Sequence, residues 1–132
     1  MIDQGWGRII NISGMASRNT GTVIGSMRNV AVTAMTKNLA AELGMHGINV
    51  TVIHPGMTRT EATEGVVARR AAAEGISEAE VEQNLAQGNL SGTIIDSSDI
   101  AYVATMLASP LSIAINGDVI AAAGGVGTAI YY

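Results

Sequence analysis

The sequence predicts an α/β domain built on a short parallel sheet of about three strands with flanking helices. Two runs rich in isoleucine and valine, 8–13 and 48–53, have the apolar character of strands buried on both faces. Residues 22–43, between them, carry apolar side chains at helical spacing. Because a strand, a crossover helix and a second strand form a βαβ unit, the two strands should be parallel and the connection right-handed.

The remainder of the chain is predicted to hold three shorter helices and a third strand. The spacing of Ser77 and Glu80 is typical of a capping box, which marks the start of a helix. Pro110 stops a later helix, because proline cannot continue one. The expected helices cover 61–75, 78–87 and 98–108, and the expected strand covers 118–123. No repeat or linker divides the chain, so residues 1–132 are expected to form one partial domain.

The composition indicates a surface that another chain covers. Only 14% of the 132 residues are charged, against roughly 25% in typical soluble domains. A homo-oligomer or a partner chain would explain this deficit. A composition rich in alanine and glycine would lower the charged fraction without any interface, and this alternative stays open.

The composition also argues against several classes of function. The net charge is −4 and the arginines are scattered, so nucleic-acid binding has no electrostatic support. The chain has no cysteine, which excludes disulfides and thiolate metal sites, and its two histidines have no carboxylate cluster beside them. We therefore expect no metal site. No apolar run is long enough to span a membrane and the first residues lack a signal-peptide pattern, so we expect a cytoplasmic protein without membrane contact.

Four segments follow one another in a characteristic order: GRIINISG at 7–14, AVTAMTKNLAAEL at 31–43, INVTVIHPGMTRT at 48–60 and INGDVIAAAGG at 115–125. In this order they resemble the C-terminal half of the short-chain dehydrogenase/reductase (SDR) family. The resemblance implies a partial Rossmann-type fold, with 57–95 corresponding to the variable substrate-loop region. It also implies an oxidoreductase that uses NAD or NADP and a Ser–Tyr–Lys site.

The catalytic positions of the family are altered in this chain. A phenol with a pKa near 10 is a poor base at neutral pH unless a cation stabilises its phenolate, and in the family a lysine does so. By resemblance, Gly25 occupies the tyrosine position, Asn29 the lysine position and Gly14 the serine position. Ser13 remains as a weak catalytic remnant, or simply as a small residue at the end of a strand. Because Lys37 is the only lysine and every tyrosine follows it, no Tyr-x-x-x-Lys motif exists in this sequence.

The cofactor site is also incomplete. The glycine-rich phosphate turn of the family lies in its N-terminal half, and 124–127, although rich in glycine, precedes no predicted helix. By resemblance, Pro55, Gly56, Thr58 and Thr60 form a vestigial nicotinamide loop. Their alternative role is a turn after a strand, with Thr60 as a helix N-cap. NAD or NADP is thus implied by the family alone, and we expect this chain by itself to bind neither.

Three functions are consistent with these residues. The first is a catalytically inactive, truncated or structural SDR-like subunit. The second is part of an active NAD(P)-dependent oxidoreductase that another polypeptide or an N-terminal half completes. The third is a small oligomerising interaction module. The first strand should be an open sheet edge, which invites pairing, and 22–43 is by resemblance the usual dimer-forming helix, so we expect a homo-oligomer or an SDR-like partner chain.

The end of the predicted sheet also carries a serine and a histidine on adjacent strands. Ser13 and His54 follow two neighbouring strands, and a serine beside a histidine is the arrangement needed for acyl transfer. The sequence offers no Gly-x-Ser-x-Gly elbow and no clear orienting acid, so this activity is not predicted.

Overall fold

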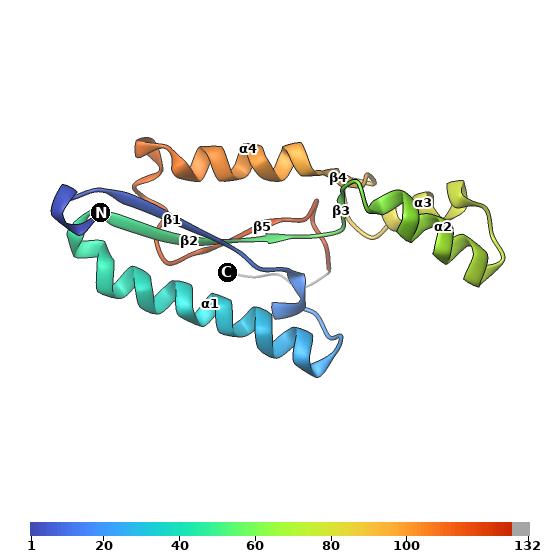
Figure 1. Cartoon of the computed structure of the whole chain (residues 1–132), viewed down its shortest axis with the longest axis horizontal. Coiled ribbons are helices and arrows are strands. Elements are labelled where there is room, and N and C mark those ends of the chain that lie inside the picture. Colours follow the sequence, from blue (N-terminus) through green and yellow to red (C-terminus); the bar gives the residue numbers. More distant parts are fainter. Residues whose placement is uncertain (128–132) are drawn as a thin grey trace.

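The computed structural model describes residues 1–127 as a three-layer α/β arrangement. A parallel sheet has the strand order β1-β2-β5, with α1 on one face and α4 on the other (Figure 1). The strands are β1 (Gly7–Ile12), β2 (Ile48–Pro55) and β5 (Val119–Ala122), and the two helices are α1 (Val23–Leu43) and α4 (Ser97–Ala108). The predicted α/β class and the short three-stranded parallel sheet are confirmed.

The strand β2 lies at the centre of the sheet. Its pairing with β1 runs from Gly7 opposite Ile48 to Ile12 opposite Ile53, and β5 pairs with its second half. Seven of the eight residues of β2 are buried, as the apolar run predicts. In the sheet formed by the described residues, β1 has a partner on one side only, so it is an edge strand.

The main core lies between β2 and α1. Ile48 and Val50, on one face of β2, pack with Ala40 of α1. The intervening residues point to the opposite face, where Asn49 is buried and donates to the carbonyl oxygens of Ser112, Ile113 and Ile115. This amide ties the connection between α4 and β5 to the central strand, because it donates to three carbonyl oxygens of that connection.

A pair of helices, α2 (Thr63–Glu74) and α3 (Glu78–Ala86), projects beyond one end of the sheet (Figure 1). They have a small core of their own, formed by Val67, Ala71 and Val81, which is separate from the main core. The predicted capping box is present, because Ser77 and Glu80 each accept from the other's backbone N–H. This pair falls within the predicted 57–95 region.

The remaining elements are short. The strands β3 (Thr58–Arg59) and β4 (Ile95–Asp96) form a second parallel sheet at the base of the helical pair. Single turns of 3-10 helix are η1 (Ile2–Gln4), η2 (Met15–Ser17), η3 (Gly44–His46) and η4 (Pro110–Ser112). Among the described helices, none combines the length and apolarity needed to cross a membrane.

One strand is longer than the sequence predicts. The expected end at residue 53 is wrong, because His54 and Pro55 pair with Ala121 and Ala122 of β5 and continue β2. Pairing with β5 therefore places His54 within the sheet, where its side chain is buried.

Candidate functional site

Five polar side chains gather where β1 and β2 end beside the first half of α1. We call them the polar cluster: Ser13, Ser17, Asn29, Thr33 and His54. Asn29 and Thr33 lie one turn apart on α1, so they share a face of the helix. Ligands of open α/β sheets bind beyond the carboxyl ends of the strands, which makes this cluster the candidate site.

One half of the cluster is built around Asn29. The hydroxyl of Ser13 donates to Asn29 Oδ1 at 2.8 Å, and Asn29 Nδ2 donates to the carbonyl oxygen of Gly25 at 2.7 Å. Gly14 lies against the same amide, because a Cβ at this position would come within 3.3 Å of Asn29 Oδ1. The structure thus brings together Ser13, Gly14, Gly25 and Asn29, none of which has a side chain that ionises near neutral pH.

The other half is built around His54, which is 1% exposed. Ser17 Oγ lies 2.8 Å from His54 Nδ1, and Thr33 Oγ1 lies 3.2 Å from Nε2. Either neutral tautomer gives both ring nitrogens a hydroxyl partner. Burial lowers the pKa of His54 below 6.5, and the positive charge of Arg18 lowers it further, so the ring is neutral at pH 7.

The serine beside His54 is not the one that the sequence suggested. Ser13 bonds to Asn29, whereas Ser17, on η2, contacts the imidazole. A neutral imidazole can act as a base for a serine hydroxyl. Here, however, the second ring nitrogen faces Thr33 and not a carboxylate, so the cluster lacks the third group that orients and charges a catalytic histidine.

The predicted nicotinamide loop, Pro55–Thr60, is closed by contacts within the chain. The hydroxyl of Thr58 donates to the carbonyl oxygen of Gly56 at 3.1 Å. A Cβ on Gly56 would approach that of Ala123 to 2.9 Å, so this glycine lets the loop pass close to β5. The loop is therefore shaped by packing against the last strand of the sheet.

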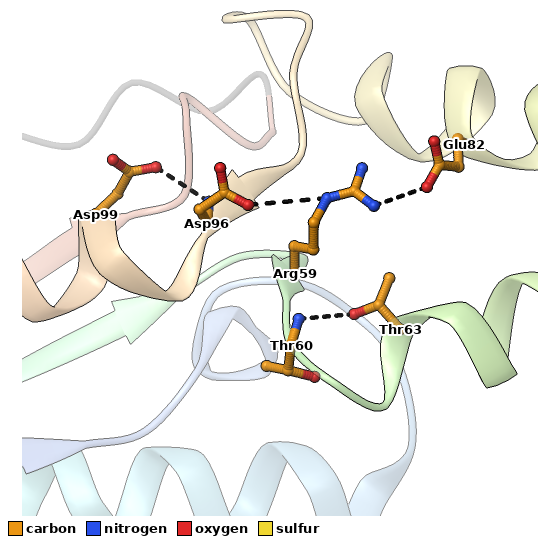
Figure 2. Close-up of polar contacts among 6 residues, drawn as sticks. All are labelled: Arg59, Thr60, Thr63, Glu82, Asp96 and Asp99. Atoms are coloured by element: carbon orange, nitrogen blue, oxygen red, sulfur yellow. Dashed lines mark hydrogen bonds and ion pairs between the residues drawn. The ribbon is translucent and has the colours of Figure 1, made fainter.

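Thr60 does not serve as the N-cap of the following helix. The backbone N–H of Thr60 donates to Thr63 Oγ1 at 2.8 Å, and α2 begins at Thr63 with Ala62 as the capping residue (Figure 2). The expected N-cap role is wrong, because the chain makes a turn before it becomes helical. The cofactor role of Pro55, Gly56, Thr58 and Thr60 stays a prediction.

Arg59, in the same loop, links three segments of the chain. Its guanidinium lies 2.7 Å from Glu82 on α3 and 3.8 Å from Asp96 on β4 (Figure 2). The hydrogen bond to Glu82 is the main reason that the pKa of Arg59 lies above its ordinary value. These side chains are 42–59% exposed, so water and salt screen both ion pairs. The ion pairs therefore contribute more to the position of α2 and α3 than to stability.

Comparison with known proteins agrees with this architecture. The family model for enoyl-(acyl carrier protein) reductase matches residues 1–127. NovJ of Streptomyces niveus, a short-chain reductase protein, is 33% identical over 123 residues, which are 92% of this chain and 45% of that protein. The chain belongs to the short-chain dehydrogenase/reductase family.

Other SDR relatives show the same coverage. FabG of Aquifex aeolicus, a 3-oxoacyl-(acyl-carrier-protein) reductase, is 30% identical over 96% of this chain and 47% of that protein. The solved structure of YwfH, an NADPH-dependent reductase involved in bacilysin biosynthesis, has a TM-score of 0.86 at 28% identity, over 98% of this chain and 50% of that one. A variant of actinorhodin polyketide ketoreductase with NADPH has a TM-score of 0.82 at 26% identity, with the same coverage. This chain spans about half the length of the curated relatives it matches.

Three residues at the site of this SDR chain were not predicted from the sequence. Thr33 was within reach, because it follows Asn29 by four residues on a predicted helix and therefore shares its face. Ser17 and Arg18 lie in a segment read only as a loop, where no periodicity indicates which side chain turns inward. Among the described residues, no group of three or more His, Cys, Asp or Glu could hold a metal ion.

His54 should make the stability of this SDR chain depend on pH. The unfolded chain binds a proton on His54 near its ordinary pKa of about 6.5, whereas the folded chain binds it only at lower pH. The contribution of His54 to the free energy of unfolding is therefore fully present above about pH 6.5. It decreases as the pH falls from there to the lowered pKa of the folded state. Urea unfolding followed by circular dichroism should give a smaller free energy at about pH 5.5 than at about pH 7.5.

Two variants isolate this proton. His54→Gln should reduce the difference in unfolding free energy between the two pH values, because glutamine does not titrate. His46→Gln, at the exposed second histidine, is the matched control and should retain the difference. If His54→Gln keeps the full difference, protonation of His54 is not the cause of the lower stability at acidic pH.

Proposed function

We propose that this chain is a structural SDR subunit that does not catalyse hydride transfer by itself. The observation that carries the proposal is the burial of Asn29, whose amide is held by Ser13 and by the carbonyl of Gly25 and which by resemblance occupies the lysine position. It supplies no positive charge. Gly25, in the tyrosine position, supplies no phenol that such a charge would activate.

Among the described residues, no tyrosine side chain lies near the polar cluster to replace the missing phenol. Tyr102 lies on α4, on the face of the sheet opposite to α1, and its side chain is 75% exposed (Figure 1). Tyr131 and Tyr132 lie outside the described residues. The polar cluster itself offers hydroxyl groups, an amide and a neutral imidazole.

The residues of this chain also fit a dinucleotide poorly. Two of the similar solved structures, YwfH and actinorhodin polyketide ketoreductase, are described with NADPH. The N–H of Thr60 and the hydroxyl of Thr58 already have partners within the chain. The Gly124–Gly127 turn precedes no helix among the described residues, so it offers no helix N-terminus to a pyrophosphate. NAD or NADP binding by this chain alone is therefore not part of the proposal.

Two apolar surfaces support an assembly with other chains. The edge strand β1 carries Ile12, which is 56% exposed, and its outer backbone groups are available for pairing among the described residues. The outer face of α1 carries five large exposed apolar side chains: Val23, Ile24, Met27, Val30 and Met35. Clusters of exposed large apolar side chains are typical of interaction sites, so we propose a homo-oligomer or an SDR-like partner chain in the cytoplasm.

A second candidate function rests on the coverage of the relatives. Because the chain spans about half of each, it could supply the C-terminal half of an active NAD(P)-dependent oxidoreductase that other residues complete. Gly25 and Asn29 would still occupy the catalytic positions, which favours the first candidate. The third, a small oligomerising interaction module, rests on the same two apolar surfaces.

The test is cofactor binding and reduction by the full chain. Titration with NADH and with NADPH should show no saturable binding at micromolar concentrations, and ketone substrates should not be reduced. The NADPH-dependent reductase YwfH serves as the positive control for NADPH binding. Micromolar affinity for either dinucleotide, or cofactor-dependent reduction of a ketone, would overturn the proposal.

A double variant separates the two parts of the proposal. Gly25→Tyr with Asn29→Lys restores the side chains of the family positions and should still bind no dinucleotide. If this variant gains NADPH-dependent reduction of a ketone, the expectation that this chain has no working cofactor site is wrong.

A further inference from the structure

A cavity of about 240 Å³ opens beside the polar cluster, at the carboxyl ends of β2 and β5. One water molecule needs only roughly 10–15 Å³ of such space, so the cavity has room for more than solvent. Sites for drug-sized ligands span about 300–1,000 Å³, which indicates a smaller molecule here. The lining residues are Met15, Arg18, Leu90, Ala121, Ala123, Gly125, Val126 and Gly127.

The walls come from three segments that are distant in the sequence. Gly124 and Gly125 have φ values of 62° and 80°, which favour glycine, and the turn they make meets the segment that carries Leu90. Ser91 fixes this contact, because both its backbone N–H and its hydroxyl donate to the carbonyl oxygen of Gly124, at 3.1 and 3.2 Å. The third wall is the η2 segment with Met15 and Arg18.

The lining of the cavity combines one charged side chain with an otherwise apolar surface. Of the lining residues given above, Arg18 is the only one with a charge, and the others present apolar side chains or glycine backbone. Leu90 is 86% exposed although it lines the cavity, so its side chain is available to a ligand. Arg18 directly follows Ser17, whose hydroxyl lies 2.8 Å from His54 Nδ1, so the charged wall adjoins the polar cluster along the chain.

We propose that this cavity binds a small organic monoanion, with its acid group at Arg18 and its apolar body against Met15, Leu90 and Val126. A guanidinium has five N–H donors in a planar fork, so one that already has a partner can still hold a carboxylate. Partial enclosure by apolar groups strengthens this charge-assisted contact, and the apolar walls favour a short aliphatic or aromatic chain over a sugar. The proposal goes beyond the function proposed above, because it requires neither a cofactor nor catalysis.

The experiment compares hexanoate with hexanamide, which have similar shape and differ in charge. Isothermal titration of the full chain should show saturable binding of hexanoate. The affinity for hexanamide should be lower by a factor of about ten or more, a difference typical of one charged hydrogen bond. Arg18→Gln should abolish this preference. Arg28→Gln, at an exposed arginine of α1, is the matched control and should keep it.

A second pair of variants tests the apolar wall. Leu90→Ala should weaken hexanoate and hexanamide by the same factor, whereas Leu111→Ala, at a leucine that is 92% exposed on η4, should change neither. Thermal unfolding of each variant shows whether it is folded. Equal binding of the two probes, no binding of hexanoate, or an unchanged preference in folded Arg18→Gln would each overturn the proposal. Dinucleotide binding is a separate measurement, so the failure of one proposal does not hide the failure of the other.

Discussion

Replacing Gly47 by alanine is expected to destabilise the chain by roughly 3 kcal/mol or more. Gly47 follows η3 with a φ of 75°, a left-handed conformation that costs a residue with a Cβ about 1–2 kcal/mol. A Cβ at this position would also collide with the carbonyl oxygen of Gly5. The collision forces apart the starts of β1 and β2, where the N–H of Gly7 donates to the carbonyl oxygen of Gly47 at 3.3 Å.

Gly75 provides the matched control, because it has a φ of 69° with no atom within 4 Å of an added Cβ. Gly75→Ala therefore carries the backbone strain without the collision and should cost about 1–2 kcal/mol. Urea unfolding of both variants, at one protein concentration, measures the difference. Equal losses in the two variants would show that the close approach of Gly5 and Gly47 contributes nothing to stability.

Replacing Ile53 by alanine should cost about 2–5 kcal/mol, the range for a large aliphatic side chain removed from a packed core. Ile53 is fully buried near the end of the central strand, with neighbouring strands on both sides. The cavity left by the substitution cannot collapse, because the backbone around it is held by the sheet. Thermal and urea unfolding should both report the loss.

Ile12 is the matched control, since it is the residue opposite Ile53 on the edge strand β1 and is 56% exposed. In an isolated chain, Ile12→Ala should change the unfolding free energy by less than about 1 kcal/mol. If the β1 edge is covered in an oligomer, the loss should be larger and should depend on protein concentration. Light scattering of the same samples distinguishes these cases, and a loss as large as that of Ile53→Ala without any oligomer would contradict the burial described here.

The elements of secondary structure could be predicted because each has a local signal. The run 8–13 and the helical periodicity of 22–43 predicted both ends of β1 and both ends of α1 to within one residue. The capping box of Ser77 and Glu80 marked the start of α3 correctly. The end of β2 could not be predicted, because His54 and Pro55 become strand only through pairing with β5, far along the chain.

The candidate site was predicted in part. The family register placed Ser13, Gly25 and Asn29, and the structure brings them into hydrogen-bonding contact. The partners of His54 were missed, since Ser17 reaches the ring from a loop whose conformation has no sequence period. The cavity with Arg18 was missed for the same reason, because its walls come from three separate segments.

The sequence by itself determined the α/β class, the parallel βαβ unit and the membership in the SDR family. These follow from periodicity, from capping residues and from the order of short motifs, all of which are local. Only the tertiary structure decided that Asn29 is buried against Ser13, that His54 lies between Ser17 and Thr33, and that Arg18 lines a cavity. Such contacts join residues that are distant in the chain, and their geometry depends on how strands and helices pack, which no local pattern of residues encodes.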